Sequence, residues 1–323
     1  MNILEAYDLT KFYGTLKAVK GISFAVREGE VFGLLGPNGA GKTTTINMLI
    51  GLARPTRGRI LYFGRDYTHN IKKAQYLMGI VPDESNLYPE LTGFENLCFC
   101  GALYGLRKAE RRAKTEFLLQ QFGLKVVKNK KFAEYSKGMK RRLAIAASII
   151  HDPPILFLDE PTTGIDVASA RHIRSVLKEL NKKGTAIFLT THYIEEAERL
   201  CDRVAFIVKG KIIKIAYVEE LIYPIKDRNI LILTLSGVYD GIEGKLSRIL
   251  PDLNFKRISD NEIRMESANP FRTGHIIHIL EEEGIEVIEV KRMHASLEDV
   301  FVKVTGIEAQ EMKRKEEKQT KEG

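Results

Sequence analysis

The sequence has 323 residues, of which 44% are hydrophobic, and carries a formal net charge of +8 at pH 7. This composition excludes an intrinsically disordered chain and provides enough residues for two domains of ordinary size. There is no run of 18 apolar residues and no basic-then-apolar leader, so the sequence predicts neither a membrane span nor secretion.

The pattern of residues 1–81 predicts several strands and one helix. Residues 1–27 alternate apolar and polar positions and contain many β-formers, which predicts an antiparallel sheet. The apolar run 31–36 predicts a buried strand, and residues 42–51 predict a helix. Two further strands are expected at residues 58–63 and 77–81.

A helical insert is expected between about residues 90 and 150. Its first helix begins at Thr92-Gly-Phe-Glu95, a capping-box pattern, and runs to about Tyr104. A basic helix follows at about residues 107–122, and a third helix at 139–150 ends before two prolines.

The core pattern then resumes. A short apolar strand is expected at 155–158, a helix at 166–180, a strand at 185–190, and a hairpin from 204–208 and 211–215. Strands that alternate with helices predict an α/β core with a parallel sheet.

The pattern changes near residue 222. The order strand, helix, strand, strand, helix, strand is the split βαβ or ferredoxin-like arrangement, with elements expected at 230–235, 242–250, 254–259, 262–266, 273–283 and 285–290. A last helix is expected from Ser296, and its apolar stripe indicates a core face or a dimer seam. We therefore predict three parts: residues 1–221, a small α+β domain at 222–305, and a charged, disordered tail at 306–323.

One glycine-rich stretch points to a bound nucleotide. It follows an apolar strand, precedes a helix and fits the pattern G-x-x-x-x-G-K-[ST]. Glycines let backbone N–H groups surround phosphate oxygens, and the helix N-terminus favours the same anion. In this pattern Lys42 reaches the β- and γ-phosphates and the Thr43 hydroxyl binds Mg²⁺. The expected nucleotide-binding residues are Gly36, Pro37, Asn38, Gly39, Ala40, Gly41, Lys42, Thr43 and Thr44.

Two acidic residues end the strand at 155–158. Asp159 emerges where α/β sheets bind ligands, and can hold Mg²⁺ through water. Glu160 beside it is then free to orient and deprotonate an attacking water.

Four further segments give the sequence a family resemblance. Tyr-Ser-Lys-Gly-Met at 135–139 resembles the LSGGQ signature of ABC transporter ATPases, with matches at Ser136 and Gly138. Asp166 matches the aspartate of the family's D-loop, and His192 its switch histidine. Tyr13 matches the aromatic residue that stacks on adenine.

Three segments, residues 83–92, the signature segment and residues 295–306, narrow the resemblance to the drug-exporter branch, the daunorubicin-resistance-like ATPases. Members of this branch carry a small C-terminal extension. The resemblance implies a P-loop NTPase with a RecA-like core. It also implies ATP and Mg²⁺ as cofactors, and a homodimer in which Ser136, Gly138 and Asp166 contact the partner's nucleotide. Glu160 is the implied general base, with His192 and Lys42 as catalytic partners.

The same resemblance implies a separate multi-span membrane permease and a peripheral location on the cytoplasmic face of the cell membrane. No stable complex with nucleic acid is expected.

Asp83 departs from the family pattern, which has a glutamine at this position. We expect Asp83 to ligate Mg²⁺ together with Thr43 and Asp159, and its charge to make turnover steeply Mg²⁺-dependent. The alternative is that Asp83 faces solvent and that Glu84 or Ser85 has this role.

The net positive charge is concentrated in one block. Residues 107–142 contain thirteen Lys or Arg and three Glu. This block indicates either a solvated helical face or a surface for phosphate, anionic lipid or an acidic partner. It keeps open a second function, a soluble ATPase that acts on nucleic acid or ribosomes. A third, a regulatory domain without hydrolysis, is disfavoured by the complete set of catalytic residues.

Overall fold

The computed structural model describes residues 1–84, 87–226, 229–239, 241–251, 253–267, 273–293 and 296–307. Contacts divide the chain into two compact units, Met1–Val218 with Phe301–Gly323, and Glu219–Val300. The predicted domain limits at residues 221 and 305 fall within a few residues of these divisions and stay predictions. The predicted tail lies outside the described residues from 308 onward.

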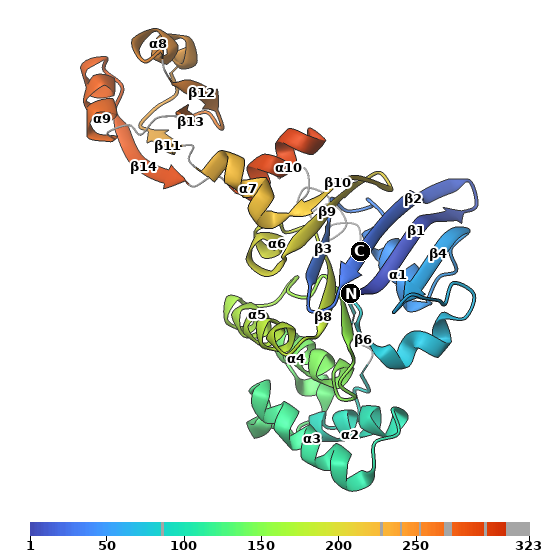
Figure 1. The fold of residues 1–323 in the computed structure, drawn as a ribbon. Coiled ribbons are helices and arrows are strands. Elements are labelled where there is room, and N and C mark those ends of the chain that lie inside the picture. Colours follow the sequence, from blue (N-terminus) through green and yellow to red (C-terminus); the bar gives the residue numbers. More distant parts are fainter. Residues whose placement is uncertain are drawn as a thin grey trace. The chain divides into compact units, whose positions relative to one another are not determined.

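The first unit contains an antiparallel sheet in the order β2-β1-β4-β5 (Figure 1). Its strands are β1 (Asn2–Tyr13), β2 (Leu16–Arg27), β4 (Arg57–Tyr62) and β5 (Arg65–Asp66). Residues 1–27 therefore form the two long strands that their alternation predicts, and β4 pairs with β1 although β2, β3 and α1 lie between them in the sequence.

A second sheet of the first unit has the order β10-β9-β3-β8-β7-β6. Its ladders are parallel except between β9 and β10, which form the predicted hairpin. The strands are β3 (Val31–Leu35), β6 (Met78–Val81), β7 (Ile155–Asp159), β8 (Ala186–Thr191), β9 (Arg203–Val208) and β10 (Lys211–Tyr217). The predicted α/β core with a parallel sheet is confirmed.

Aromatic residues join the two sheets. The rings of Phe24 on β2, Phe32 on β3 and Phe188 on β8 stack with centroids 5.5–5.8 Å apart. Helix α1 (Lys42–Ile50) contacts β2 as well as β7 and β8. Strands β7 and β8 are buried along their whole length, and α1 buries six of its residues, so α1 is held in place from both sheets.

The helical insert is present as α2 (Gly93–Leu103), α3 (Lys108–Gln121) and α4 (Lys137–Ser148), with short 3-10 helices at Lys125–Val127 and Phe132–Glu134. The predicted capping box is confirmed, because Thr92 Oγ accepts from the Glu95 amide while the Glu95 carboxylate accepts from the Thr92 amide. Helix α4 contacts β6, α2, α3 and α5 (Val167–Lys182), so the signature segment sits on the core.

The structure adds elements that the sequence reading lacks. They include β5, the 3-10 helix Ile71–Leu77 before β6, α6 (Ile194–Leu200) and α7 (Val218–Lys226). The burial of Ile194, Ala197 and Leu200 on α6 has helical spacing, which is a signal that the sequence contained.

The second unit has the predicted element order, with β11 (Asn229–Leu235), α8 (Ile242–Ile249), β12 (Asn254–Arg257), β13 (Glu262–Ser267), α9 (Thr273–Glu282) and β14 (Val287–Met293). Its antiparallel sheet has the order β12-β13-β11-β14, in which the first and third strands of the motif lie at the centre. The two helices cover a core that includes Leu233, Met265 and Leu280. The expected ferredoxin-like arrangement is therefore found.

The burial of helix α10 (Leu297–Thr305) shows whether its apolar stripe is a core face or a dimer seam. Leu297 and Phe301 are fully buried, and the Phe301 ring meets the ring of Phe206 edge-on with centroids 5.2 Å apart. The stripe is therefore a core face.

Asn96 is a buried polar residue that holds the segment before α2. Its side chain accepts from the Tyr88 amide at 2.9 Å and donates to the carbonyls of Tyr88, Leu91 and Thr92. Asn96→Ala should lower the free energy of unfolding by about 2–3 kcal/mol, because several buried backbone groups lose their partner. Urea denaturation measures this loss. As the matched control, Asn47→Ala changes a half-buried helical asparagine without such bonds among the described residues and should be within about 0.5 kcal/mol of wild type; equal losses would contradict the prediction.

Candidate functional site

The predicted site residues follow four neighbouring strands at one edge of the parallel sheet. Residues 36–44 follow β3, His192 follows β8, Asp159 and Glu160 end β7, and Asp83 follows β6. In the sheet these strands are adjacent, in the order β3-β8-β7-β6. The fold thus brings together side chains that are up to 156 residues apart in the sequence, from Gly36 to His192.

The phosphate loop, residues 36–44, needs glycine for two different reasons. A Cβ on Gly36 would collide with the backbone of Ile207 on β9, so the loop can pass only without a side chain. Gly41 has φ +105° and is the N-cap of α1, a conformation that L-residues with a side chain rarely adopt. The loop therefore ends on a helix N-terminus, whose free N–H groups suit a phosphate.

Lys42 is buried at the centre of this arrangement. Its ammonium donates to the carbonyls of Gly36 at 2.8 Å and Pro37 at 3.4 Å, and lies 3.4 Å from the Glu160 carboxylate. Burial lowers the pKa of Lys42, while Glu160 and Asp159 oppose this effect. The lysine is thus a cation fixed between the phosphate loop and the acidic end of β7.

Glu160 is the acidic partner of Lys42. Its carboxylate is 11% exposed and lies 3.0 Å from Nδ1 of His192, and Thr163 donates to its other oxygen at 3.1 Å. Burial, the largest influence, acts to raise the pKa of Glu160, but His192, Lys42 and Thr163 together outweigh burial and the pKa is lowered. An ionised carboxylate next to a histidine is suited to accept a proton from water.

Asp159 has different surroundings. Burial raises its pKa, and hydrogen bonds from Thr190 and Thr43 oppose this effect. A hydroxyl from the start of α1 and a carboxylate at the end of β7 are hard oxygen ligands of the kind that Mg²⁺ prefers. The donor set at Thr43 and Asp159 therefore fits the expected metal. Among the described residues there is no cluster of three or more His, Cys, Asp or Glu that could hold a metal by itself.

Asp83 contacts Arg141, which the sequence did not predict. Its carboxylate is 61% exposed and accepts from the guanidinium of Arg141 at 3.2 Å. No contact of Asp83 with Thr43 or Asp159 is present in the described part of the chain, so its role as a metal ligand stays a prediction. Of the two alternatives, Glu84 is exposed and Ser85 lies outside the described residues.

The signature segment and the D-loop aspartate pack against each other. Ser136 is the N-cap of α4 and accepts from the Met139 amide at 3.3 Å. Gly138 lies so close to Ser169 and Asp166 that a Cβ would collide with both side chains. Asp166 is the N-cap of α5 and accepts from the Ser169 amide at 2.8 Å, which lowers its pKa. Ser136 and Asp166 are exposed, so both are accessible to a second molecule.

Tyr13 ends β1 and is 49% exposed, with the Lys11 ammonium 5.0 Å from its ring centroid. The ring is therefore available for stacking, and its contact with adenine stays a prediction.

The basic block divides into separate groups. Arg141 is buried, Arg142 donates to the Phe122 carbonyl, and Lys114 and Lys128 form ion pairs with Asp152 and Glu116. These four positions therefore have partners within the protein, and the choice between a solvated face and a binding surface concerns the other basic residues of the block.

Sequence reasoning missed three residues that hold the site together. Thr190 donates to Asp159, Arg141 binds the backbone of Glu160, and the buried Glu196 accepts from Thr162 and Thr191. For Thr190 a signal existed, since a threonine at the end of a buried strand is unusual unless it is hydrogen-bonded.

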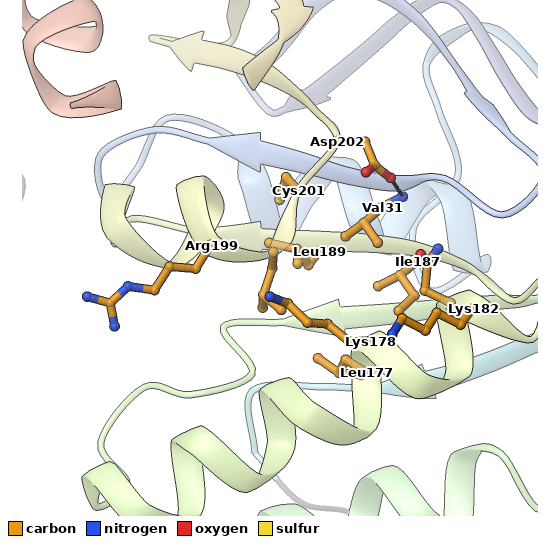
Figure 2. A pocket seen from close by; sticks show the side chains of 11 residues that line it. Val31, Leu177, Lys178, Lys182, Ile187, Leu189, Arg199, Cys201 and Asp202 are labelled. Carbon is orange, nitrogen blue, oxygen red and sulfur yellow. Dashed lines mark hydrogen bonds between the residues drawn. The ribbon is translucent and has the colours of Figure 1, made fainter. Parts of the chain in front are cut away.

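A cavity of about 270 Å³ lies away from the predicted site, between α5, α6, β3 and β8 (Figure 2). Its floor is apolar, Arg199 points out of it, and the Asp202 carboxylate accepts from the Val31 amide at 2.8 Å. None of the predicted nucleotide-binding or catalytic residues lines it.

Comparisons with known proteins agree on one family. Residues 19–163 match the family model described as ABC transporter. The linearmycin resistance ATP-binding protein LnrL of Bacillus subtilis (strain 168) is 38% identical over 307 residues, which cover 94% of this chain and 98% of LnrL. The bacitracin transport ATP-binding protein BcrA of Bacillus licheniformis is 33% identical over 311 residues, which cover 94% of this chain and 98% of BcrA.

Among solved structures, a dimeric post-hydrolysis state of an ATP-binding cassette bound to ADP and Pi is similar, with a TM-score of 0.62 and 27% identity. The match covers 66% of this chain and 98% of that chain. An ATP-binding subunit of an ABC transporter has a TM-score of 0.63 and 32% identity, over 69% of this chain and 92% of that chain.

The buried Glu196 should make the free energy of unfolding depend on pH. Burial raises its pKa above the ordinary value of 4.5, so its proton is lost from the unfolded chain at a lower pH than from the folded protein. The contribution of Glu196 to native stability is therefore fully present below this value and is lost as pH rises through the folded pKa. Relative to wild type, Glu196→Gln should gain stability between pH 4.5 and 8, as measured by urea denaturation. In Glu195→Gln, which changes the exposed neighbour, no such trend is expected; parallel curves for wild type and Glu196→Gln would contradict the prediction.

Proposed function

The chain belongs to the ABC transporter family, and from this premise we propose that it powers a membrane exporter as a homodimer bound to a multi-span permease. It is an ATPase and the ATP-binding subunit of an ABC-type exporter. The catalytic part of the proposal rests on one cluster of three side chains. The Glu160 carboxylate lies 3.4 Å from the Lys42 ammonium and 3.0 Å from Nδ1 of His192.

The proposed hydrolysis uses these residues as follows. ATP lies over the phosphate loop, with its phosphates on the α1 N-terminus and its base on Tyr13. Lys42 turns from the carbonyls of its own loop to the β- and γ-phosphates. Glu160, ionised at neutral pH, accepts a proton from the attacking water, and His192 orients the water and the γ-phosphate. Mg²⁺, when bound, neutralises charge on the phosphate oxygens.

We place the metal ligands at Thr43, Asp159 and Asp83. To join these ligands the Asp83 carboxylate would leave Arg141, which its exposure allows. The bonds of Arg141 to the carbonyls of Pro82 and Glu160 would still connect the loop after β6 to Glu160. A charged ligand binds Mg²⁺ more tightly than a neutral amide.

Asp83→Gln should therefore raise the Mg²⁺ concentration for half-maximal ATPase rate about three- to tenfold at fixed ATP. A Mg²⁺ titration of the rate measures this shift. Glu84→Gln is the matched control, with the same change of charge one residue further on. Superposable titrations of wild type and Asp83→Gln would contradict the assignment, and a shift in Glu84→Gln alone would move it to Glu84.

A second copy of the chain is proposed to complete each site. One chain has one set of motifs, and a similar solved cassette is a dimer bound to ADP and Pi. Of the three residues expected to meet the partner's nucleotide, Ser136 and Asp166 are exposed and Gly138 is buried, and the apolar Val167 is 73% exposed. An exposed apolar residue next to exposed polar caps is consistent with a surface that closes on another molecule.

The membrane partner is proposed to bind the helical insert. Tyr88 and Phe99 are partly exposed and pack edge-on, and Leu103 on the same helix is 70% exposed. Arg107 and Arg111 lie near them in the sequence and add positive charge at the start of α3. Among the described residues no helix is long and apolar enough to cross a membrane. We infer a peripheral location on the cytoplasmic face of the cell membrane, through the permease.

A pull-down tests this proposal. Glu160→Gln keeps the size of the side chain but cannot accept a proton, so ATP should hold the dimer closed on its partners. The tagged variant is expressed in its own cells, and membranes are solubilised in mild detergent. A stoichiometric protein with several membrane spans is expected, and less of it with Lys42→Ala. Reversal of Arg107, Arg111 and Arg112 to Glu should weaken its recovery at low salt. Ribosomal or nucleic-acid partners without a membrane protein would overturn the proposal.

A further inference from the structure

Arg141 connects the two strand ends that hold Asp83 and Glu160. It lies in the first turns of α4, and its side chain is 7% exposed. One terminal nitrogen donates to the Pro82 carbonyl at 2.5 Å, and the other donates to the Asp83 carboxylate at 3.2 Å and the Glu160 carbonyl at 2.9 Å. The three acceptors come from the loops after β6 and β7.

The chemistry of these contacts requires arginine. A guanidinium presents several donors in a fixed planar fork, whereas lysine is a single point charge on a flexible stem. Two of the acceptors are backbone carbonyls, and a buried carbonyl that loses its donor costs free energy. The fork thus fixes the distance between the Asp83 loop and the Glu160 backbone.

Both the backbone and the side chain of Glu160 are held by neighbouring residues. Its backbone has φ +49°, which is uncommon for a residue with a side chain, and its amide donates to Thr190 at 3.1 Å. Its carboxylate is held by Lys42 and His192, as described above. Arg141 donates to the Glu160 carbonyl at 2.9 Å, and the Thr163 amide donates to the same oxygen at 3.3 Å, so Arg141 helps to fix the orientation of this peptide.

The two ends of this connection differ in exposure. The Asp83 carboxylate is largely exposed, whereas the Glu160 carboxylate is nearly buried. A molecule that displaces the Asp83 loop from outside would therefore act on the same guanidinium that holds Glu160.

We propose that Arg141 is a positioning residue for ATP hydrolysis, which links the Asp83 loop to the backbone of Glu160 so that a change in one alters the other. The inference rests on hydrolysis of ATP by this chain, and it does not depend on which protein is the membrane partner. Arg141 contacts none of residues 36–44 through a hydrogen bond or ion pair among the described residues, so it acts on turnover and leaves ATP binding to the phosphate loop.

The test compares Arg141→Lys with Arg142→Lys in the full chain. Arg142 is the adjacent arginine of the same helix and donates to the Phe122 carbonyl at 3.0 Å, away from the site. Arg141→Lys should lower kcat about tenfold or more while KM for ATP changes less than about threefold, because small displacements of a catalytic group cost much rate. Arg142→Lys should keep kcat within about twofold of wild type.

A second variant makes the test independent of the folding of Arg141→Lys. Asp83→Asn changes an exposed residue and removes the ion pair, while Arg141 keeps its bonds to Pro82 and Glu160. Amide hydrogen exchange at residues 160–163, measured without nucleotide, should become faster in this variant. The losses in kcat from Asp83→Asn and Arg141→Lys should be less than additive in the double variant.

Three results would overturn the inference. The first is that the fraction of folded protein in Arg141→Lys falls by the same factor as its rate, so that unfolding explains the whole loss. The second is additive losses in the double variant, which would mean that Asp83 acts independently, for example on the metal alone. The third is unchanged exchange at residues 160–163 in Asp83→Asn.

Discussion

The site depends on a buried carboxylate that remains charged. Glu160 is removed from water, which by itself would favour its protonated form. The Lys42 ammonium and the His192 ring reverse that preference, and in return the carboxylate stabilises the buried lysine. Neither buried charge is stable alone, since an unpaired charge in the interior costs several kcal/mol. The cluster therefore forms as a unit, and a phosphate that attracts Lys42 also changes the surroundings of Glu160.

The parallel sheet makes this cluster possible. Parallel strands end at the same edge, so the order β3-β8-β7-β6 places the phosphate loop, His192, Glu160 and Asp83 in one row. The aromatic stack between the two sheets and the burial of α1 fix the first member of the row. Helix α4 fixes the other members of the row, Glu160 and Asp83, because its Arg141 donates to the loops after β6 and β7. The same helix begins at Ser136, so a molecule that binds the exposed N-terminus of α4 acts on an element that also holds Glu160.

Local patterns correctly predicted the strands and the helix that carry the candidate site. Glycines followed by Lys42 and Thr43 specify the phosphate loop, and four apolar residues before Asp159 specify a strand end. The partners of these residues were not predictable in the same way. Arg141 and Glu160 are 19 residues apart, and Thr190 and Asp159 are 31 apart. Their contacts arise from strand order and helix packing, neither of which a local pattern records. The role of Asp83 shows the same limit, because its position in the motif indicated a metal and the fold gave it Arg141 as a neighbour.

The sequence by itself determined the fold of both units and the family, because periodicity and short motifs are local properties of the chain. Tertiary structure alone decided which of the thirteen basic residues of the block are buried or paired, whether the stripe on α10 is core, and the charge state of Glu160. Each of these depends on burial and on neighbours distant in sequence, and both exist only once the sheets and helices have packed. For that reason Lys42 and Arg141, both cations in the printed sequence, have different contacts: Lys42 donates to carbonyls of the phosphate loop, and Arg141 donates to the backbone of Glu160.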